Sequence, residues 1–141
     1  MNKKYRGQVA ENLALKLLRQ KKHILLATNY RCRAGEIDII TLDKKQKEIV
    51  FVEVRSRWTG KFPTKENPLV STPEDSVSFP KINKIEKTAW DFLEKKPTVW
   101  QRYFQKIPLY SFPDWRIDLI SVVVEISSRK ARLRHYQYLF V

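Results

Sequence analysis

Two periodicities divide the chain into segments. Apolar residues recur with helical spacing over about 6–21 and again over about 80–95, which predicts two amphipathic helices. Runs rich in β-branched residues predict a strand over about 23–33, a hairpin over about 36–55 and two further strands near the C-terminus. This order of elements predicts an α/β fold in which helices form layers around a mixed sheet.

The central hairpin places carboxylates between large apolar residues. A four-residue loop, 44–47, would set Asp43 opposite Glu48. Further along the ladder, the same register sets Asp38 opposite Glu53. Directly opposed positions have Cβ atoms roughly 4.5–5.5 Å apart, so two carboxylates there could share one divalent cation and would repel one another without it.

The same register brings a cation beside this acidic pair. Glu36 is expected to face Arg55. Because side chains alternate along a strand, Glu53 and Arg55 share one face and Val54 lies on the other. A second interpretation stays open, because alternating charged and apolar residues also describe a sheet with one solvated face.

The first helix contributes a third acidic side chain. Its buried stripe is predicted to comprise Val9, Ala10, Leu13, Ala14, Leu17 and Leu18. Glu11 falls at the margin of this stripe, so its carboxylate is expected to point toward the sheet. Glu11 is either paired with a nearby arginine or joins Asp38 and Glu53 in one acidic site.

The chain is strongly basic. Its 28 Lys and Arg residues against 15 Asp and Glu residues give a net charge of +13, which suits polyanions such as phosphate backbones. Lys81 falls in the first turn of the second helix, where a cation opposes the helix dipole, so it is either solvated or functional. The candidate nucleic-acid contacts are Lys3, Lys4, Arg6, Arg19, Arg31, Arg33, Arg57, Lys61 and Lys81.

Two stretches lack regular periodicity. The segment 56–79 contains three prolines and begins beside the acidic pair, which indicates a mobile loop that orders on substrate. The stretch 96–115 interleaves aromatic and cationic side chains that could stack on unpaired bases, although core or dimer packing is the commoner role. Asp118 in the later motif RIDLI is expected to pair with a basic neighbour and to stay outside the catalytic set.

Length and composition predict one domain over 1–141, with enough apolar residues for a core. Cys32 is the only cysteine, so no internal disulfide can form, and two histidines make a structural zinc site improbable. The N-terminus has no secretory apolar segment, and no run is long enough to span a bilayer. A cytoplasmic protein without membrane binding is therefore expected.

Several short motifs together resemble the YraN family of small bacterial proteins. They are GQVAENLA at 7–14, TNYR at 28–31, GEIDII at 35–40 and FVEVRSR at 51–57, and the likeness continues through 81–93 and WRIDLI at 115–120. The YraN family belongs to the PD-(D/E)xK superfamily, which includes restriction endonucleases and archaeal Holliday-junction resolvases. The resemblance therefore implies a restriction-endonuclease-like, three-layer α/β/α sandwich around a mixed central sheet.

The resemblance also implies a site. It assigns Asp38 and Glu53 as ligands of Mg²⁺ or Mn²⁺, with the carbonyl of Val54 completing the shell, and Glu11 as the helical carboxylate of the site. Arg55 stands in the position of the motif's lysine. Because arginine stays protonated at any working pH, it could stabilise charge on a phosphate but could hardly accept a proton from water.

Two functions follow from these residues. The first is a metal-dependent endonuclease that hydrolyses phosphodiester bonds of DNA, with a preference for branched or flapped DNA and a homodimeric state implied by the resolvases alone. The second is a nucleic-acid-binding protein that keeps the fold but does not cleave.

Overall fold

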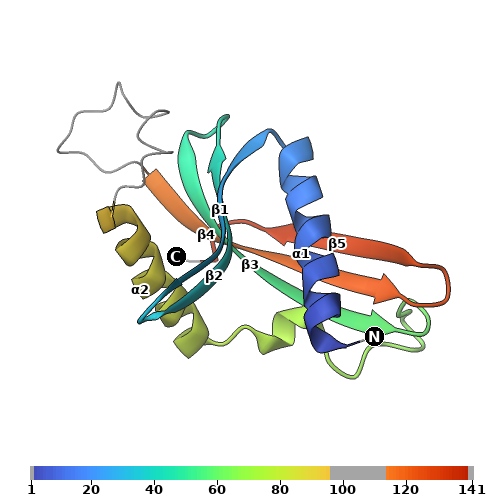
Figure 1. The fold of residues 1–141 in the computed structure, drawn as a ribbon. Helices are drawn as coiled ribbons and strands as arrows, with labels where there is room; N and C mark the ends of the chain where they lie inside the picture. Colours follow the sequence, from blue (N-terminus) through green and yellow to red (C-terminus); the bar gives the residue numbers. More distant parts are fainter. Residues whose placement is uncertain (1, 96–113, 140–141) are drawn as a thin grey trace.

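The computed structural model describes residues 2–95 and 114–139, and Figure 1 shows their arrangement. The elements are α1 (Lys3–Gln20), β1 (His23–Cys32), β2 (Gly35–Asp43), β3 (Glu48–Thr59), the 3₁₀ turn η1 (Pro73–Ser76), α2 (Phe79–Lys95), β4 (Asp114–Glu125) and β5 (Lys130–Tyr136). The predicted order of helices and strands is confirmed. The predicted stacking residues at 96–113 lie outside the described residues.

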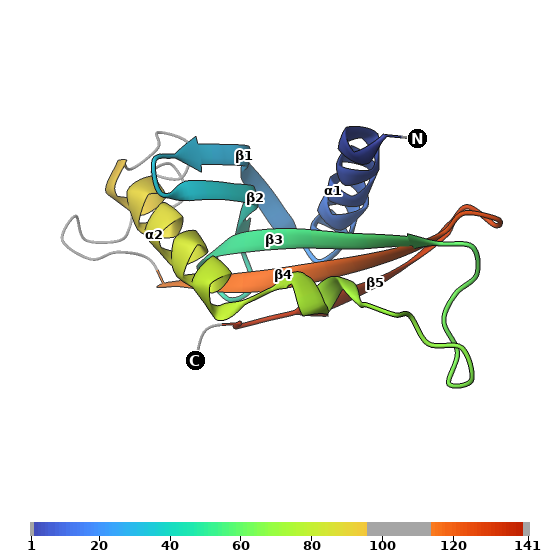
Figure 2. The same cartoon turned by 90° about the horizontal axis from the view of Figure 1, so that it is seen from below.

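The five strands form one sheet in the order β1-β2-β3-β4-β5. Strands β3 and β4 are parallel, and the other neighbours are antiparallel, so the predicted mixed sheet is confirmed. Helix α1 covers one face and α2 the other (Figure 2). This is the predicted three-layer α/β/α arrangement, consistent with a nuclease-like α/β fold.

Each helix buries a narrow apolar stripe against its face of the sheet. From α1, Ala10, Ala14 and Leu18 pack on a cluster that includes Val50 and Val52 of β3. These small side chains and one leucine allow the helix to approach the strands closely. The remaining leucines of the predicted stripe, Leu13 and Leu17, are only partly buried.

Helix α2 begins and packs as its sequence predicts. The side chain of Ser78 accepts a hydrogen bond from the backbone N–H of Lys81 at 3.4 Å, which caps the first turn. Its buried residues are Ile85, Thr88, Ala89, Phe92 and Leu93. Phe92 meets the ring of Phe51 edge to face, with ring centroids 5.8 Å apart, so α2 is anchored on the middle of β3.

The β2–β3 hairpin has the predicted four-residue turn, with Asp43 paired to Glu48. Its ladder ends at the pair of Ile39 with Val52. Beyond that point β2 pairs only with β1 and β3 pairs only with β4, so the two strands diverge. The expected pairing of Glu36 with Arg55 is wrong, because Glu36 lies opposite Arg31 of β1.

The predicted loop at 56–79 begins later than expected. Strand β3 continues to Thr59, because its second half pairs with β4 over its full length. The irregular part therefore starts at Gly60 and is followed by η1. It is held at one end by a hydrogen bond from the Phe62 N–H to the Glu125 carboxylate at 2.6 Å. The mobility of this segment stays a prediction.

Candidate functional site

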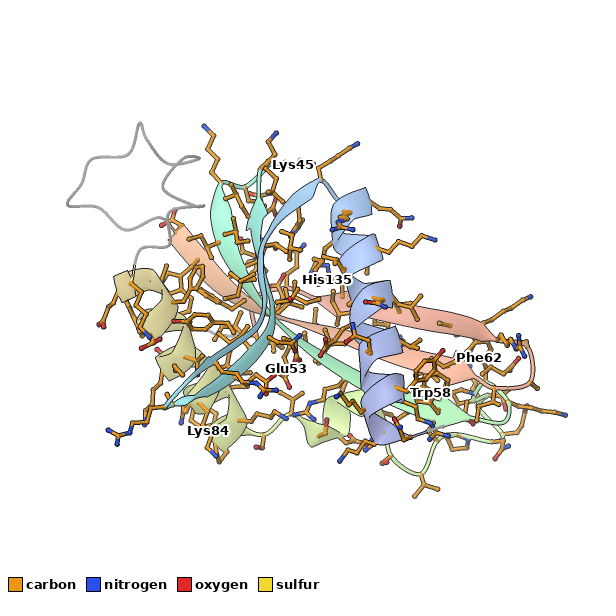
Figure 3. The ribbon with its side chains drawn as sticks, in the orientation of Figure 1. Lys45, Glu53, Trp58, Phe62, Lys84 and His135 are labelled. Carbon is orange, nitrogen blue, oxygen red and sulfur yellow. The ribbon has the colours of Figure 1, made fainter. Side chains whose placement is uncertain are left out.

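The predicted acidic pair lies where β2 and β3 diverge. The backbone N–H of Val54 donates a hydrogen bond of 2.8 Å to Oδ2 of Asp38. In a continued ladder this N–H would bond to a backbone carbonyl, so the Asp38 carboxylate takes the place of that acceptor. The side chain of Asp38 therefore enters the fork between the strands and meets Glu53, labelled near the centre of Figure 3.

Glu53 makes two ion pairs with one of its oxygens. Its Oε1 lies 3.0 Å from Nη2 of Arg55 and 3.3 Å from Nζ of Lys81, and the Glu53 side chain is only 8% exposed. The predicted sharing of one strand face by Glu53 and Arg55 is confirmed, with Val54 packed on the α1 side. One interpretation of the sequence left Lys81 solvated. In the structure the first turn of α2 instead places its ammonium group beside Glu53.

The two carboxylates disturb one another. Burial, and then the charge of Glu53, raise the pKa of Asp38 to about 7, although the Val54 N–H opposes this. Burial also raises the pKa of Glu53, with Arg55 acting in the opposite direction. Raised pKa values mean that the negative charges are not fully compensated by the surrounding protein groups. An additional cation would supply the missing positive charge.

Glu11 stands near this pair but is not packed against it. Burial and then the charge of Glu36 raise its pKa, while a hydrogen bond with the Asn29 side chain lowers it. Asn29 has a positive φ of 50°, which interrupts the regular alternation of β1 and aims its amide at α1. Because Glu11 also raises the pKa of Asp38, it lies within electrostatic range of the acidic pair.

A cavity of about 320 Å³ opens beside the pair, on the α2 side of the sheet. Its lining combines the fork with the first turns of α2: Gly35, Glu36, Asp38, Glu53, Val54, Arg55, Lys81, Lys84 and Ile85. Gly35 approaches α2 so closely that a Cβ there would lie 3.2 Å from Oγ1 of Thr88. The tip of the β1–β2 hairpin thus forms one wall of the cavity.

Two charged lining residues, Glu36 and Lys84, were not among the sequence candidates. Lys84 follows Lys81 by three residues, a helical spacing that puts both on one face of α2 and could have revealed it. The predicted register placed Glu36 opposite β3, whereas the structure pairs it with β1. In the structure its Oε1 lies 3.3 Å from Nε of Arg31.

The remaining predicted nucleic-acid contacts are spread over three regions. Arg33 is exposed in the β1–β2 turn. Lys3, Lys4, Arg6, Arg57 and Lys61 lie toward the N-terminus of α1 and the far end of β3, where Arg6 sits over the Trp58 ring at 5.2 Å. Arg19 is exposed at the opposite end of α1. Of the nine predicted contacts, Lys81 lines the cavity, and the role of all nine in binding nucleic acid stays a prediction.

The oxygen donors at the fork suit a hard divalent cation. The carboxylates of Asp38 and Glu53 and the carbonyl of Val54 are the kind of ligands that Mg²⁺ and Mn²⁺ take. Within residues 2–95 and 114–139, no three His, Cys, Asp or Glu side chains are arranged to hold a metal together. The fit rests on two carboxylates whose charge is only partly compensated, with Glu11 farther away. No helix among the described elements is both long and apolar enough to cross a membrane.

Comparison with known proteins agrees with the resemblance of the motifs. Residues 10–122 match the model of the family described as "Uncharacterised protein family UPF0102". A UPF0102 protein of Caldicellulosiruptor bescii is 44% identical over 93 residues, covering 66% of this chain and 70% of that protein. A UPF0102 protein of Clostridium botulinum strain Hall is 33% identical over 118 residues, covering 84% and 79%. The chain therefore belongs to the UPF0102 family, also called the YraN family.

Proposed function

We propose that this protein is a metal-dependent endonuclease that hydrolyses phosphodiester bonds of DNA. One observation carries the proposal: the half-buried Asp38 and the buried Glu53 have raised pKa values and lie next to cations on the wall of a cavity. Buried groups with strongly perturbed pKa values in a hollow are characteristic of functional sites. The net charge of +13 supports a polyanionic substrate.

The residues divide the chemistry of hydrolysis among them. Asp38, Glu53 and the Val54 carbonyl would hold the cation, which activates water and neutralises the scissile phosphate when it is bound. Glu11 would orient the attacking water from the α1 side. Arg55 and Lys81 would contact the phosphate and stabilise the negative charge that builds up as the bond breaks.

Arg55 decides how the site can work. Its guanidinium keeps its proton, so it cannot act as the general base. It can still stabilise charge, and Lys81 adds an ammonium group on the same Glu53 oxygen. With a divalent cation held by the Glu53 carboxylate, Arg55 and Lys81 would be available to contact the phosphate.

Cleavage assays test the activity directly. Plasmid, flap and four-way-junction DNA would be incubated with Mg²⁺ or Mn²⁺ and either the wild type or Glu53→Ala. Glu94→Gln, a change at an exposed residue of α2, is the matched control. We expect metal-dependent cleavage by the wild type and the control and its loss in Glu53→Ala. Absence of cleavage by the wild type on all three substrates would contradict the proposal.

Metal binding can be measured separately from cleavage. Asp38→Asn keeps an acceptor oxygen for the Val54 N–H but removes one charged ligand. Isothermal titration with Mn²⁺ is expected to show binding by the wild type and at least about a tenfold loss of affinity in the variant. Unchanged affinity would remove the metal site from the proposal.

A second function is supported by the ion pairs of Glu53. Because Arg55 and Lys81 already occupy its Oε1, the site is partly neutralised without a metal. A protein that binds nucleic acid without cleaving it would need no more than this. Salt-sensitive DNA binding without metal-dependent cleavage, in the wild type and Glu53→Ala alike, would favour this function. The DNA preference, the homodimer and the cytoplasmic location stay predictions.

A further inference from the structure

A second cavity, of about 340 Å³, lies on the same side of the molecule as the acidic site. One wall is a proline-rich stretch, residues 60–72, which we call the strap. Figure 2 shows the strap leaving the end of β3 and returning to η1 past the face of β4 and β5 that is opposite α1. The other wall consists of Ser121 and Val123 of β4 with Arg132 and Arg134 of β5.

The sheet register links this cavity to the acidic site. Arg55 of β3 pairs with Ser121 of β4, and Ser121 pairs in turn with Arg134 of β5. Directly paired residues of neighbouring strands point to the same face, and adjacent strands are about 4.8 Å apart. Ser121 in the second cavity is therefore the immediate neighbour of Arg55 in the first, and the two hollows follow one another across the sheet.

The second cavity combines apolar walls with a basic rim. Pro63, Pro68 and Leu69 of the strap and Val123 contribute its apolar surface. Lys65, Arg132 and Arg134 supply three cations around it, against one acidic lining residue, Glu74. An apolar slot edged by positive charge matches a nucleotide, whose base has apolar faces and whose phosphate is negative.

Ser121 adds a polar group inside the slot. The residue is only 2% exposed, and its hydroxyl can both donate and accept a hydrogen bond. The edge of a base offers both donors and acceptors to such a group.

The strap contacts the sheet near both of its ends. The guanidinium of Arg132 lies over the ring of Phe62 at 4.0 Å from its centroid. Nε of Arg57 donates a hydrogen bond of 3.2 Å to Oγ of Ser71 near the other end. Contacts at both ends hold the slot open, which lowers the ordering cost of binding.

We propose that this slot binds one unpaired nucleotide of the strand whose phosphate lies at the acidic site. The base would insert between the strap and β4, with its edge at Ser121, and the adjoining phosphates would contact Arg134 and Arg55. The inference rests on the proposed function and defines its substrate as DNA with an unpaired base beside the bond that is cut. Fully paired DNA would leave the slot empty.

Binding measurements without metal test the slot independently of cleavage. Fluorescence anisotropy in EDTA would compare duplex DNA bearing a short single-stranded overhang with the same DNA in which the overhang is abasic. The variants are Leu69→Trp, which fills the slot from the strap, and Arg134→Ala. Lys45→Ala removes the same charge at the β2–β3 turn, which Figure 3 shows far from Glu53.

We expect the wild type and Lys45→Ala to bind the base-containing overhang roughly tenfold more tightly than the abasic one, as for stacking of a single base. Leu69→Trp should lose this preference and keep its affinity for blunt duplex. Arg134→Ala should weaken binding of both overhangs. Equal affinity of the wild type for the two overhangs would overturn the proposal, whether or not the protein cleaves DNA, and so would a preference that survives in Leu69→Trp.

Discussion

Two acidic clusters lie at different places along β3, and they differ in how their charge is compensated. One is the pair Asp38 and Glu53 at the fork. The other surrounds Arg116 of β4, whose Nη1 lies 3.1 Å from both Asp43 and Glu48 and whose Nε lies 3.0 Å from Asp118. We call this second group the Arg116 cluster.

The Arg116 cluster is compensated from all sides. Burial alone would raise the pKa of Asp43, but hydrogen bonds from the Gln46 N–H and from Arg116 outweigh it and lower that pKa. His135 of β5 adds a hydrogen bond of 2.7 Å to Asp118. Carboxylates from three strands thus converge on one guanidinium, whose side chain is 1% exposed.

This difference supports a structural role for the Arg116 cluster and the proposed functional role for the fork. Both clusters bury acidic side chains, yet only the fork has carboxylates with raised pKa values and a cavity beside them. A buried carboxylate whose charge is fully paired has no capacity left for a ligand. Incomplete compensation, not burial of acids as such, therefore marks the site in this protein.

Removing Arg116 should have the largest effect. Arg116→Met leaves three buried carboxylates without their shared cation, and we expect the free energy of unfolding to fall by about 3–5 kcal/mol. Urea denaturation followed by circular dichroism measures it. Arg55→Met is the matched control and should cost much less, because Lys81 remains paired with Glu53. A similar loss in both variants would erase the distinction between the clusters.

Replacing one carboxylate in each cluster should change stability in opposite directions. Asp118→Asn takes a charge from Arg116 and His135, so we expect a loss of about 1–3 kcal/mol. Asp38→Asn removes the repulsion with Glu53 and keeps an acceptor for Val54, so we expect a gain of up to about 1 kcal/mol. Both are read from urea denaturation in EDTA. A loss of stability in Asp38→Asn would mean that the fork is already compensated.

Lowering the pH should destabilise the folded protein through protonation of His23, which lies beside Asp43 of the Arg116 cluster. Burial lowers the pKa of His23 from 6.5, and the charges of Arg116 and His135 add to this while Asp43 and Asp118 oppose it. The unfolded chain therefore binds the proton more readily than the folded one. Stability from neutral His23 is present above the unfolded pKa and is lost as the pH falls below it, until the folded pKa is reached.

The measurement compares the wild type with His23→Asn at about pH 7.5 and 5.5, where linkage predicts a loss of roughly 1 kcal/mol in the wild type alone. Asn offers a polar group in place of Nδ1, which lies 2.7 Å from Oγ1 of Thr41. Asp38, whose raised pKa acts in the opposite direction, is present in both proteins and cancels in the difference. Parallel pH profiles would rule out this role of His23.

The smallest expected effect is the change in DNA binding when one cation of the fork is removed. Lys81 is partly exposed at the fork and available to phosphate, whereas Arg116 is enclosed. For duplex DNA, Lys81→Ala should reduce the slope of log affinity against log salt by about 1. Lys87→Ala, at an exposed position of the same helix, is the control for a lost charge. Equal slopes in the two variants would show that Lys81 contacts no phosphate.

Local patterns were sufficient for the elements and for part of the site. The periods of α1 and α2, the turn between Asp43 and Glu48 and the pairing of Asp118 with a basic neighbour are all confirmed. Each depends on residues that are near in sequence or on one face of one element. The Arg116 cluster as a whole could not be predicted, because its members come from separate strands.

The sequence by itself determined which residues alternate, where the helices begin and which acids lie among apolar residues, because these follow from local geometry. Only the tertiary structure decided that the ladder stops at Ile39 and Val52, that Glu36 turns to Arg31 and that Lys81 reaches Glu53. The physical reason is that strand divergence depends on competing pairing with β1 and β4. That divergence also decides which carboxylates have too few cations around them to balance their negative charge.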